Sequence, residues 1–263
     1  MRKLPLILTV AAMLCLAACS DTPDTTPDTA PPSNTDTPLT GELTVFAAAS
    51  LTNVFTAIGK DFEDANPGVT VTFQFDGSSA LASQINEGGV ADVFASADEA
   101  NMAKVTDTGK ASNPTIFATN NLVLAVPSDN PAQVATIKDL EKDNMKTVVC
   151  APEVPCGAIA TRVLEASNVT ITPASLEQNC TAVATKLTMG EADAGFVYST
   201  DVAASGGQLT AVDLPSEAIA TAKTPYPIVA VGSGGELADA FIAYVLGSKG
   251  QATLAQAGFG SPS

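Results

Sequence analysis

The chain has 263 residues, which is enough for one large domain or two lobes of ordinary size. Its 28 acidic and 12 basic side chains give a formal charge of −16 at pH 7, which argues against nucleic acid or anionic lipid as a binding partner. The sequence contains no histidine, which excludes histidine-based catalytic triads, histidine general bases and the commonest zinc sites.

A targeting signal opens the chain. Two basic residues precede an apolar run over 4–16, which is too short for a stable transmembrane span. The run ends in LAAC at 16–19, which resembles a bacterial lipobox and implies cleavage before Cys19 and a lipid on its sulfur. We therefore expect a signal peptide over 1–18. The alternative is an ordinary secretion signal with an incidental cysteine.

Residues 19–40 are expected to form a lipid-anchored tether. The stretch over 22–40 is rich in Thr, Pro and Asp and contains one large apolar residue, Leu39. Such a composition cannot bury enough apolar surface to fold, so we expect it to be disordered. The sequence therefore predicts an extracytoplasmic protein that is anchored to the membrane through Cys19.

The first predicted strand and helix meet at Ser50. Residues 43–46 are an apolar run typical of a buried strand, and apolar residues at helical spacing follow from Val54. Ser50 is thus placed at a helix N-cap, where unpartnered N–H groups and the helix dipole favour an anion. The alternative interpretation is that Ser50 only caps its own helix.

The alternation of strands and helices continues along the chain. It predicts strands at 69–75, 93–95, 122–126, 147–150, 169–171, 194–198 and 225–231. It predicts helices from 78 to about 87, 98–105, 137–140, 157–167, 180–190, 237–246 and 250–257. This order is typical of an α/β fold with mainly parallel strand pairing.

The arrangement at Ser50 recurs at other helix starts. Ser78, Cys156 and Cys180 each lie where a predicted helix begins behind a strand or loop. Ligand sites in open α/β sheets lie at the carboxyl ends of strands, so these helix starts can converge on one cleft. The sequence permits this convergence but does not require it.

Several motifs carry a resemblance to a known family. They are FAAASLTNVF at 46–55, FDGSSALASQI at 75–85, ADVFASAD at 91–98, VPCGAIA at 154–160 and GFVYSTDV at 195–202. In this order, over about 43–259, the chain resembles the periplasmic molybdate-binding proteins of ABC importers. The resemblance implies a two-lobed type II periplasmic-binding-protein fold that holds a tetrahedral oxyanion in the cleft between its lobes.

The resemblance also implies how the chain divides into lobes. Lobe I would comprise 41–124 and 230–263, and lobe II would comprise 125–229. The crossing segments would lie near 122–127 and 225–231. A monomer that delivers its ligand to a membrane permease is the expected assembly.

The family holds its oxyanion with two serine hydroxyls, two backbone amides and one tyrosine hydroxyl. The resemblance assigns these roles to Ser50, Ser78, the amides of Cys156 and Cys180, and Tyr198. Ser79 competes with Ser78, and Tyr198 is otherwise an ordinary core residue of its strand. Cysteine departs from the expected residue at both amide positions, although the backbone donors remain. Asp201 is a candidate for orienting a donor, and Tyr226 and Tyr244 are assigned to the core or an interface.

The proposed ligand groups are all hydrogen-bond donors. A fully deprotonated dianion has only acceptor lone pairs, so its site requires donors alone. Phosphate keeps a proton near neutral pH and should require a carboxylate acceptor, which none of the five positions supplies. The set therefore favours molybdate, tungstate or sulfate, and no cofactor is expected.

Three cysteines, Cys150, Cys156 and Cys180, remain in the exported fold. An odd number in an oxidising compartment leaves one of them unpaired. Cys150 and Cys156 flank a short loop with two prolines, so we expect a disulfide between them. Pairing of Cys156 with Cys180 is the alternative, and the oxidising compartment argues against a metal site.

The expected function is capture of molybdate, and of tungstate, for an ABC importer. The same fold binding sulfate or another small anion is the nearest alternative, and a structural surface lipoprotein is a further one. An enzyme using Ser50 or Cys156 is disfavoured, because the chain has neither a histidine base nor a G-x-S-x-G elbow.

Overall fold

The computed structural model describes residues 38–262. The predicted signal peptide, the lipidation site at Cys19 and the tether before residue 38 lie outside the described residues. Of the predicted tether, Leu39 packs against the hydrophobic core. Within 38–262, none of the helices combines the length and apolar character that crossing a bilayer requires.

The described strands form a mixed sheet in the order β2-β1-β3-β9-β4-β7-β5-β6, with β8 paired to β4. The strands are β1 (Gly41–Ala48), β2 (Val69–Asp76), β3 (Val93–Ala95), β4 (Thr115–Pro127), β5 (Thr147–Cys150), β6 (Ser175–Glu177), β7 (Ala194–Tyr198), β8 (Leu209–Val212) and β9 (Lys223–Ala230).

The helices alternate with these strands, which makes the fold α/β, as the sequence predicted. They are α1 (Thr52–Ala65), α2 (Ser78–Asn86), α3 (Glu99–Thr106), α4 (Pro155–Ala166), α5 (Cys180–Thr188), α6 (Ser199–Ala204), α7 (Ser216–Ile219), α8 (Glu236–Leu246) and α9 (Ser248–Gln256), with 3₁₀ turns η1 (Ala49–Leu51) and η2 (Ile137–Glu141).

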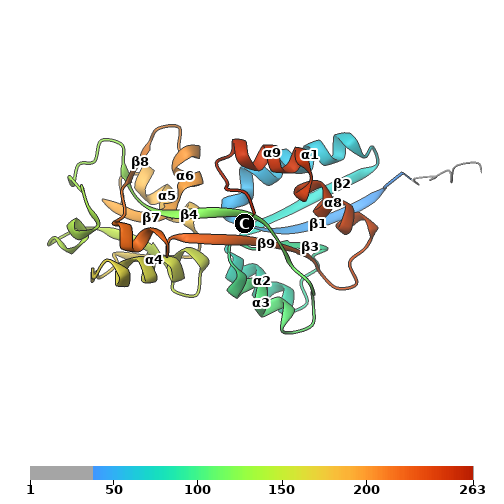
Figure 1. Ribbon diagram of the computed structural model, residues 1–263, viewed down its shortest axis with the longest axis horizontal. Coiled ribbons are helices and arrows are strands. Elements are labelled where there is room, and N and C mark those ends of the chain that lie inside the picture. The colour runs from blue at the N-terminus through green and yellow to red at the C-terminus, as the bar shows by residue number, and fades with distance from the viewer. Residues whose placement is uncertain (1–37, 263) are drawn as a thin grey trace, which may run out of the picture. The chain divides into compact units, whose positions relative to one another are not determined.

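The first lobe is built from both ends of the folded chain. Its strand β1 pairs in parallel with β2 and β3, and β3 pairs antiparallel with β9. Helices α1, α8 and α9 cover one face of these strands, and α2 and α3 cover the other (Figure 1). The C-terminal helices therefore complete a lobe that the N-terminal strands begin.

The second lobe is formed by the middle of the chain. Strand β5 pairs in parallel with β6 and β7, and β4 pairs antiparallel with β7 and β8. Helix α4 lies on the opposite side of these strands from α5 and α6 (Figure 1). This lobe is continuous in sequence between the two strands that join it to the first.

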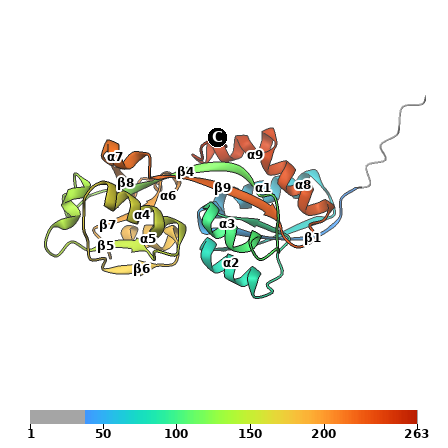
Figure 2. The same ribbon diagram turned by 60° about the horizontal axis from the view of Figure 1, so that its bottom comes forward.

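Strands β4 and β9 run side by side and join the two lobes (Figure 2). On β4 the pairing changes at one point, because Asn121 pairs with Lys223 of β9 whereas Leu122 pairs with Tyr198 of β7. The crossing connection is thus a two-stranded antiparallel ribbon. The lobe limits at 124/125 and 229/230 stay predictions.

The core of the first lobe is aromatic. Helical spacing puts Phe55 and Phe62 on the buried face of α1, where both contact Phe241 of α8 with ring centroids 6.2 Å and 5.3 Å away. Phe73 of β2 packs within 6.3 Å of Phe55. A Cβ on Gly59 would lie 2.5 Å from the Phe73 ring, so glycine allows helix and strand to approach closely here.

The predicted strand at 169–171 is wrong. The structure has no strand there, and its edge strand β6 is Ser175–Glu177, paired to β5. Val169 is instead buried in the core behind the end of α4, where Asn168 adopts a left-handed φ of 50°. On the edge strand Leu176 is 53% exposed, so β6 carries no buried apolar pattern that sequence inspection could detect.

Candidate functional site

A small cavity lies between the lobes, where several helices begin. Its volume is about 20 Å³, slightly more than the roughly 10–15 Å³ that holds one water. It is lined by Ala48, Ala49, Ser50, Gly77, Ser78, Ala97, Val154, Pro155, Cys156, Asn179, Cys180 and Tyr198. The structure therefore brings all five predicted site residues to one place, and none of the described lining residues carries a charge.

Ser50 comes from the turn η1 between β1 and α1. Its prediction as a helix N-cap is wrong, because the N-cap of α1 is Leu51 and neither η1 nor α1 has a side-chain cap. The inserted 3₁₀ turn moves the serine off the cap position. Its Oγ lies instead 2.9 Å from the hydroxyl oxygen of Tyr226 on β9.

Ser78 is the first residue of α2, and Gly77 is the N-cap. The Ser78 side chain is 1% exposed, and its Oγ accepts the N–H of Ala97 at 2.9 Å. No acceptor for its O–H is found within the described residues, so the proton is available to a ligand in the cavity. Ser79, the competing choice, does not line the cavity.

The two predicted amide donors lie in the first turns of α4 and α5. Pro155 is the first residue of α4 and has no N–H, so Cys156 provides the first backbone donor of that helix. Cys180 is the first residue of α5, whose N-cap Asn179 accepts the N–H of Ala182. N–H groups in a first helical turn have no intrahelical partner and lie at the positive end of the helix dipole.

The three cysteines of the described chain lie together, with their sulfurs within 4.8 Å of one another. Cys150 and Cys156 form a disulfide, with Cα atoms 5.8 Å apart, and Cys180 is a buried free thiol 3.9 Å from the Cys150 sulfur. Burial raises the pKa of the Cys180 thiol well above its usual value. Because two of the sulfurs are joined, this cluster does not offer three thiolates to a metal.

The disulfide belongs to a tightly packed loop at the start of α4. A Cβ on Gly157 would lie 2.0 Å from the carbonyl oxygen of Ala151, so only glycine fits at this position. The loop is therefore held against the helix by the disulfide and by this close backbone contact. Its packing fixes the position of the Cys156 amide.

Tyr198 ends β7 with its hydroxyl in a dry environment. The residue is 2% exposed, and among the described residues its hydroxyl has no hydrogen-bond partner. Burial, and next the neighbouring Tyr226, raise its pKa well above the usual value, so the hydroxyl stays protonated. A buried unpaired hydroxyl costs about 1–3 kcal/mol, a cost that an acceptor placed in the cavity would relieve.

Asp201 supports Tyr198 from the first turn of α6. Its carboxylate accepts the backbone N–H of Tyr198 at 2.9 Å. Burial raises the pKa of Asp201 to about 6, and the Tyr198 N–H opposes that rise. Asp201 thus holds the backbone of Tyr198 and does not contact its hydroxyl.

Tyr226 has a role that the sequence did not indicate. It is fully buried, as a core assignment expects, but its hydroxyl also reaches Ser50. The two residues are 176 positions apart, and Tyr226 sits in an apolar strand with no local motif. No sequence signal distinguishes it from a packing residue.

Residues 43–260 match the family of bacterial extracellular solute-binding proteins. The chain belongs to this family. It is 41% identical over 221 residues to the molybdate-binding protein ModA of Mycobacterium tuberculosis, across 84% of this chain and 85% of that protein. The family description indicates a solute-binding protein that acts outside the cytoplasm.

Two solved structures share the fold. The periplasmic molybdate-binding protein of Azotobacter vinelandii superposes with a TM-score of 0.72 at 20% identity, covering 84% of this chain and 100% of that one. The sulfate-binding protein SubI of Mycobacterium tuberculosis gives a TM-score of 0.72 at 17% identity, covering 83% and 86%. Both likenesses establish the two-lobed α/β fold, which accommodates proteins named for different oxyanions.

Proposed function

We propose that this protein captures molybdate, and also tungstate, for an ABC importer, and that it is not an enzyme. The observation that carries the proposal is the cavity between the lobes, which offers hydrogen-bond donors from both lobes and no charged side chain. The 41% identity to a mycobacterial molybdate-binding protein supports the choice of anion. Ser50, Ser78, the amides of Cys156 and Cys180, and Tyr198 are the proposed ligand groups.

The chemistry of these groups suits a dianion. Hydrogen bonds to a charged partner contribute roughly 1.5–3 kcal/mol each, so five of them offset the ordering costs of binding. The helix dipoles of α2, α4 and α5 supply positive potential without a lysine or arginine.

The same chemistry disfavours phosphate. Monohydrogen phosphate would bring a proton that requires an acceptor in the cavity. The one side-chain amide lining it, Asn179, already accepts the N–H of Ala182 through its carbonyl oxygen. The phosphate proton would then have to pair with a serine or tyrosine hydroxyl that the anion requires as a donor, which weakens binding.

The proposal extends to the parts of the chain beyond the cavity. Residues 1–18 would be removed as a signal peptide, and Cys19 would carry the lipid that anchors the protein to the membrane. Residues 41–124 and 230–263 would form lobe I, and 125–229 would form lobe II. A monomer in this form would present its bound oxyanion to the membrane permease.

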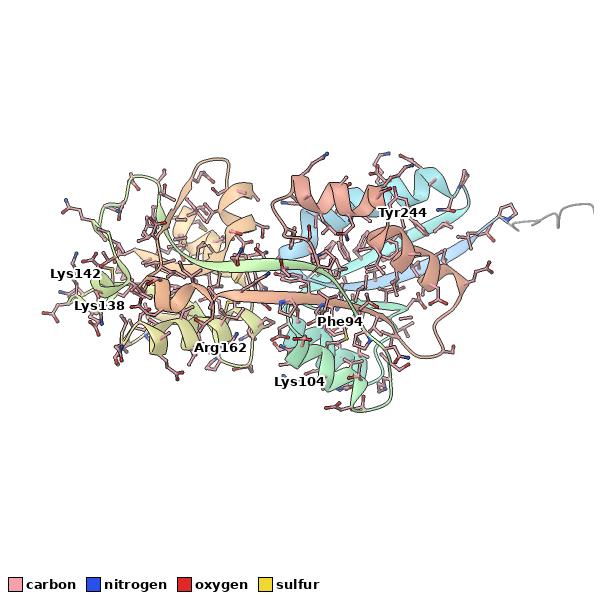
Figure 3. The ribbon with its side chains drawn as sticks, viewed as in Figure 1. Phe94, Lys104, Lys138, Lys142, Arg162 and Tyr244 are labelled. Carbon is pink, nitrogen blue, oxygen red and sulfur yellow. A yellow bond between two sulfur atoms is a disulfide. The ribbon has the colours of Figure 1, made fainter. Side chains whose placement is uncertain are left out.

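Isothermal titration calorimetry with molybdate, tungstate, sulfate and phosphate tests the proposal. We expect molybdate and tungstate to bind more tightly than sulfate, and phosphate to bind least. Tyr198→Phe and Ser78→Ala should each weaken molybdate binding about tenfold to a hundredfold, because each removes one donor to a charged ligand. Tyr244→Phe is the matched control, since Tyr244 lies on α8 in the first lobe (Figure 3) and does not line the cavity.

Other results of these binding experiments would favour the alternative functions. Tighter binding of sulfate than of molybdate would make this a sulfate-binding member of the same fold. The absence of any anion-induced thermal shift would support a structural surface lipoprotein. Wild-type molybdate affinity in both site variants would overturn the ligand assignment.

A further inference from the structure

Tyr226 lies where the crossing ribbon passes the anion cavity. It belongs to β9, pairs with Ala118 of β4, and is completely buried. Its ring packs edge-on against Tyr198 with centroids 5.9 Å apart, and its hydroxyl oxygen is 2.9 Å from Ser50 Oγ. One side chain thus contacts a proposed ligand residue from each lobe.

The hydrogen bond between Tyr226 and Ser50 has two possible directions. If Ser50 donates its only proton to Tyr226, it turns lone pairs toward the cavity and repels an anion. The Tyr226 proton is then left with only the neighbouring Tyr198 hydroxyl as an acceptor, because within the described residues no carbonyl or carboxylate accepts from Tyr226. If Tyr226 donates to Ser50 instead, the Tyr226 proton is paired and the Ser50 proton is free for the anion.

Ser78 also has a hydrogen bond at its Oγ, and in this one the donor is known. Its Oγ accepts from the backbone N–H of Ala97, which can only donate. The Ser78 proton is therefore directed to a different acceptor. Each proposed serine ligand has one hydrogen-bonding neighbour at its oxygen, a backbone amide for Ser78 and a tyrosine hydroxyl for Ser50.

We propose that Tyr226 is a positioning residue of the anion site, which donates to Ser50 and so directs the Ser50 proton into the cavity. This inference rests on the proposed function. The Tyr226 hydroxyl remains a donor throughout, since burial raises its pKa far above the usual value. Its ring, held between Phe117 and Phe259 at 6.2 Å and 5.5 Å, fixes the hydroxyl in place.

A double-mutant cycle tests the inference. Molybdate affinity is measured by calorimetry for the wild type, Tyr226→Phe, Ser50→Ala and the double variant, with Tyr244→Phe as the control. Phenylalanine keeps the buried ring, and the thermal midpoint of each ligand-free variant verifies folding. We expect Tyr226→Phe to weaken binding about twofold to tenfold, the range of one net hydrogen bond.

The decisive comparison is between the double variant and Ser50→Ala alone. If Tyr226 acts through Ser50, the two affinities agree within about twofold, because the second change removes nothing further. If Tyr226 has a purely structural role, Tyr226→Phe should lower the thermal midpoint, and the affinity loss of the double variant should be the product of the losses in the two single variants. The inference would be overturned if the affinity loss of the double variant equals the product of the two single losses. It would also be overturned if Tyr226→Phe binds molybdate like the wild type while Ser50→Ala binds it weakly. Wild-type affinity in Ser50→Ala would instead overturn the proposed site itself.

Discussion

Asp201, a buried carboxyl group near the cavity, makes the stability of the fold depend on pH. Its carboxylate holds the Tyr198 N–H, yet burial raises its pKa to about 6 from an ordinary 3.8. Between these two values the folded protein binds more protons than the unfolded chain. The free energy of unfolding therefore falls as the pH rises through that window, and it levels off above about pH 6.

Replacing Asp201 with asparagine should remove this pH dependence. The introduced carboxamide would keep an oxygen that accepts the Tyr198 N–H, but it has no proton to lose in this pH range. Compared with the wild type, Asp201→Asn should gain stability as the pH rises from about 4 to 6 and keep that gain at pH 7. Urea unfolding across this range measures the difference, and parallel curves for the two proteins would contradict the prediction.

A control separates this effect from the general loss of one negative charge. Asp129 is exposed and distant in sequence from the cavity residues. Asp129→Asn should therefore follow the wild-type curve over the same pH range. A gain equal to that of Asp201→Asn would assign the effect to net charge and not to burial.

At the residue scale, the sequence predicted some features of the site and missed others. The resemblance to the molybdate-binding family assigned five residues that the structure gathers around one cavity. It did not identify Tyr226, whose partner Ser50 is 176 positions away, because a contact across two lobes leaves no local pattern. The sequence pattern also misjudged Ser50, since a 3₁₀ turn and an α-helical start are not distinguished by the same short run of small residues.

Among the elements, the start of α2 lies very close to the residues that precede α5 in the second lobe. A Cβ added to Gly77 would lie 2.3 Å from the carbonyl oxygen of Gln178, which precedes α5. The backbone of Gly77 has a φ of −58°, which any residue adopts, so its lack of a side chain matters only for this contact. Glycine here allows the two helix starts to close around the cavity.

Gly77→Ala should therefore hinder closure and leave each lobe intact. We expect molybdate affinity to fall at least about tenfold, since the methyl group would keep the donors of α2 and α5 apart. The thermal midpoint of the ligand-free protein should change little, because an open arrangement accommodates the methyl group. Calorimetry and thermal unfolding measure the two effects.

Gln178→Ala provides the matched control. The Gln178 side chain is exposed, and the contact with Gly77 involves only its backbone oxygen. This variant should bind molybdate like the wild type. Unchanged affinity in Gly77→Ala would show that closure does not depend on the contact.

Element types were predictable where the apolar pattern was strong. The buried faces of α1 and β7 follow from their sequences, whereas the edge strand β6 has no buried residue and the short strand β8 has only one, so both leave little signal. The β-branched residues at 169–171 are typical of a strand, but here Val169 is buried behind the end of a helix while Thr170 is exposed. In these segments the secondary structure is set by tertiary packing and not by the local sequence pattern.

For the whole molecule, the main electrostatic feature is its excess of acid. The net charge is −16, and basic residues such as Lys138 and Lys142 lie at the far end of the second lobe (Figure 3). The field of the protein therefore repels an oxyanion at long range, although the helix starts attract it at contact. Salt screens the first effect beyond about 8 Å at physiological ionic strength, and it affects the short-range contacts less.

The association rate of molybdate should consequently rise with added inert salt. Stopped-flow tyrosine fluorescence can follow binding, since the chain has no tryptophan and Tyr198 lines the cavity. Sodium chloride and choline chloride at equal ionic strength should give equal acceleration. A rate that is independent of salt, or that falls with it, would contradict long-range repulsion.

The path of the chain through the two lobes has a consequence for its biogenesis. An exported polypeptide emerges from its N-terminus, yet β1 to β3 lack the neighbour β9 and the aromatic cover of Phe241 until nearly the whole chain has crossed. The middle lobe can fold earlier, as its segments arrive consecutively. Because Tyr226 follows Ser50 by 176 residues, the hydrogen bond between them forms only after most of the chain has crossed, so the complete cavity is among the last parts of the fold to assemble.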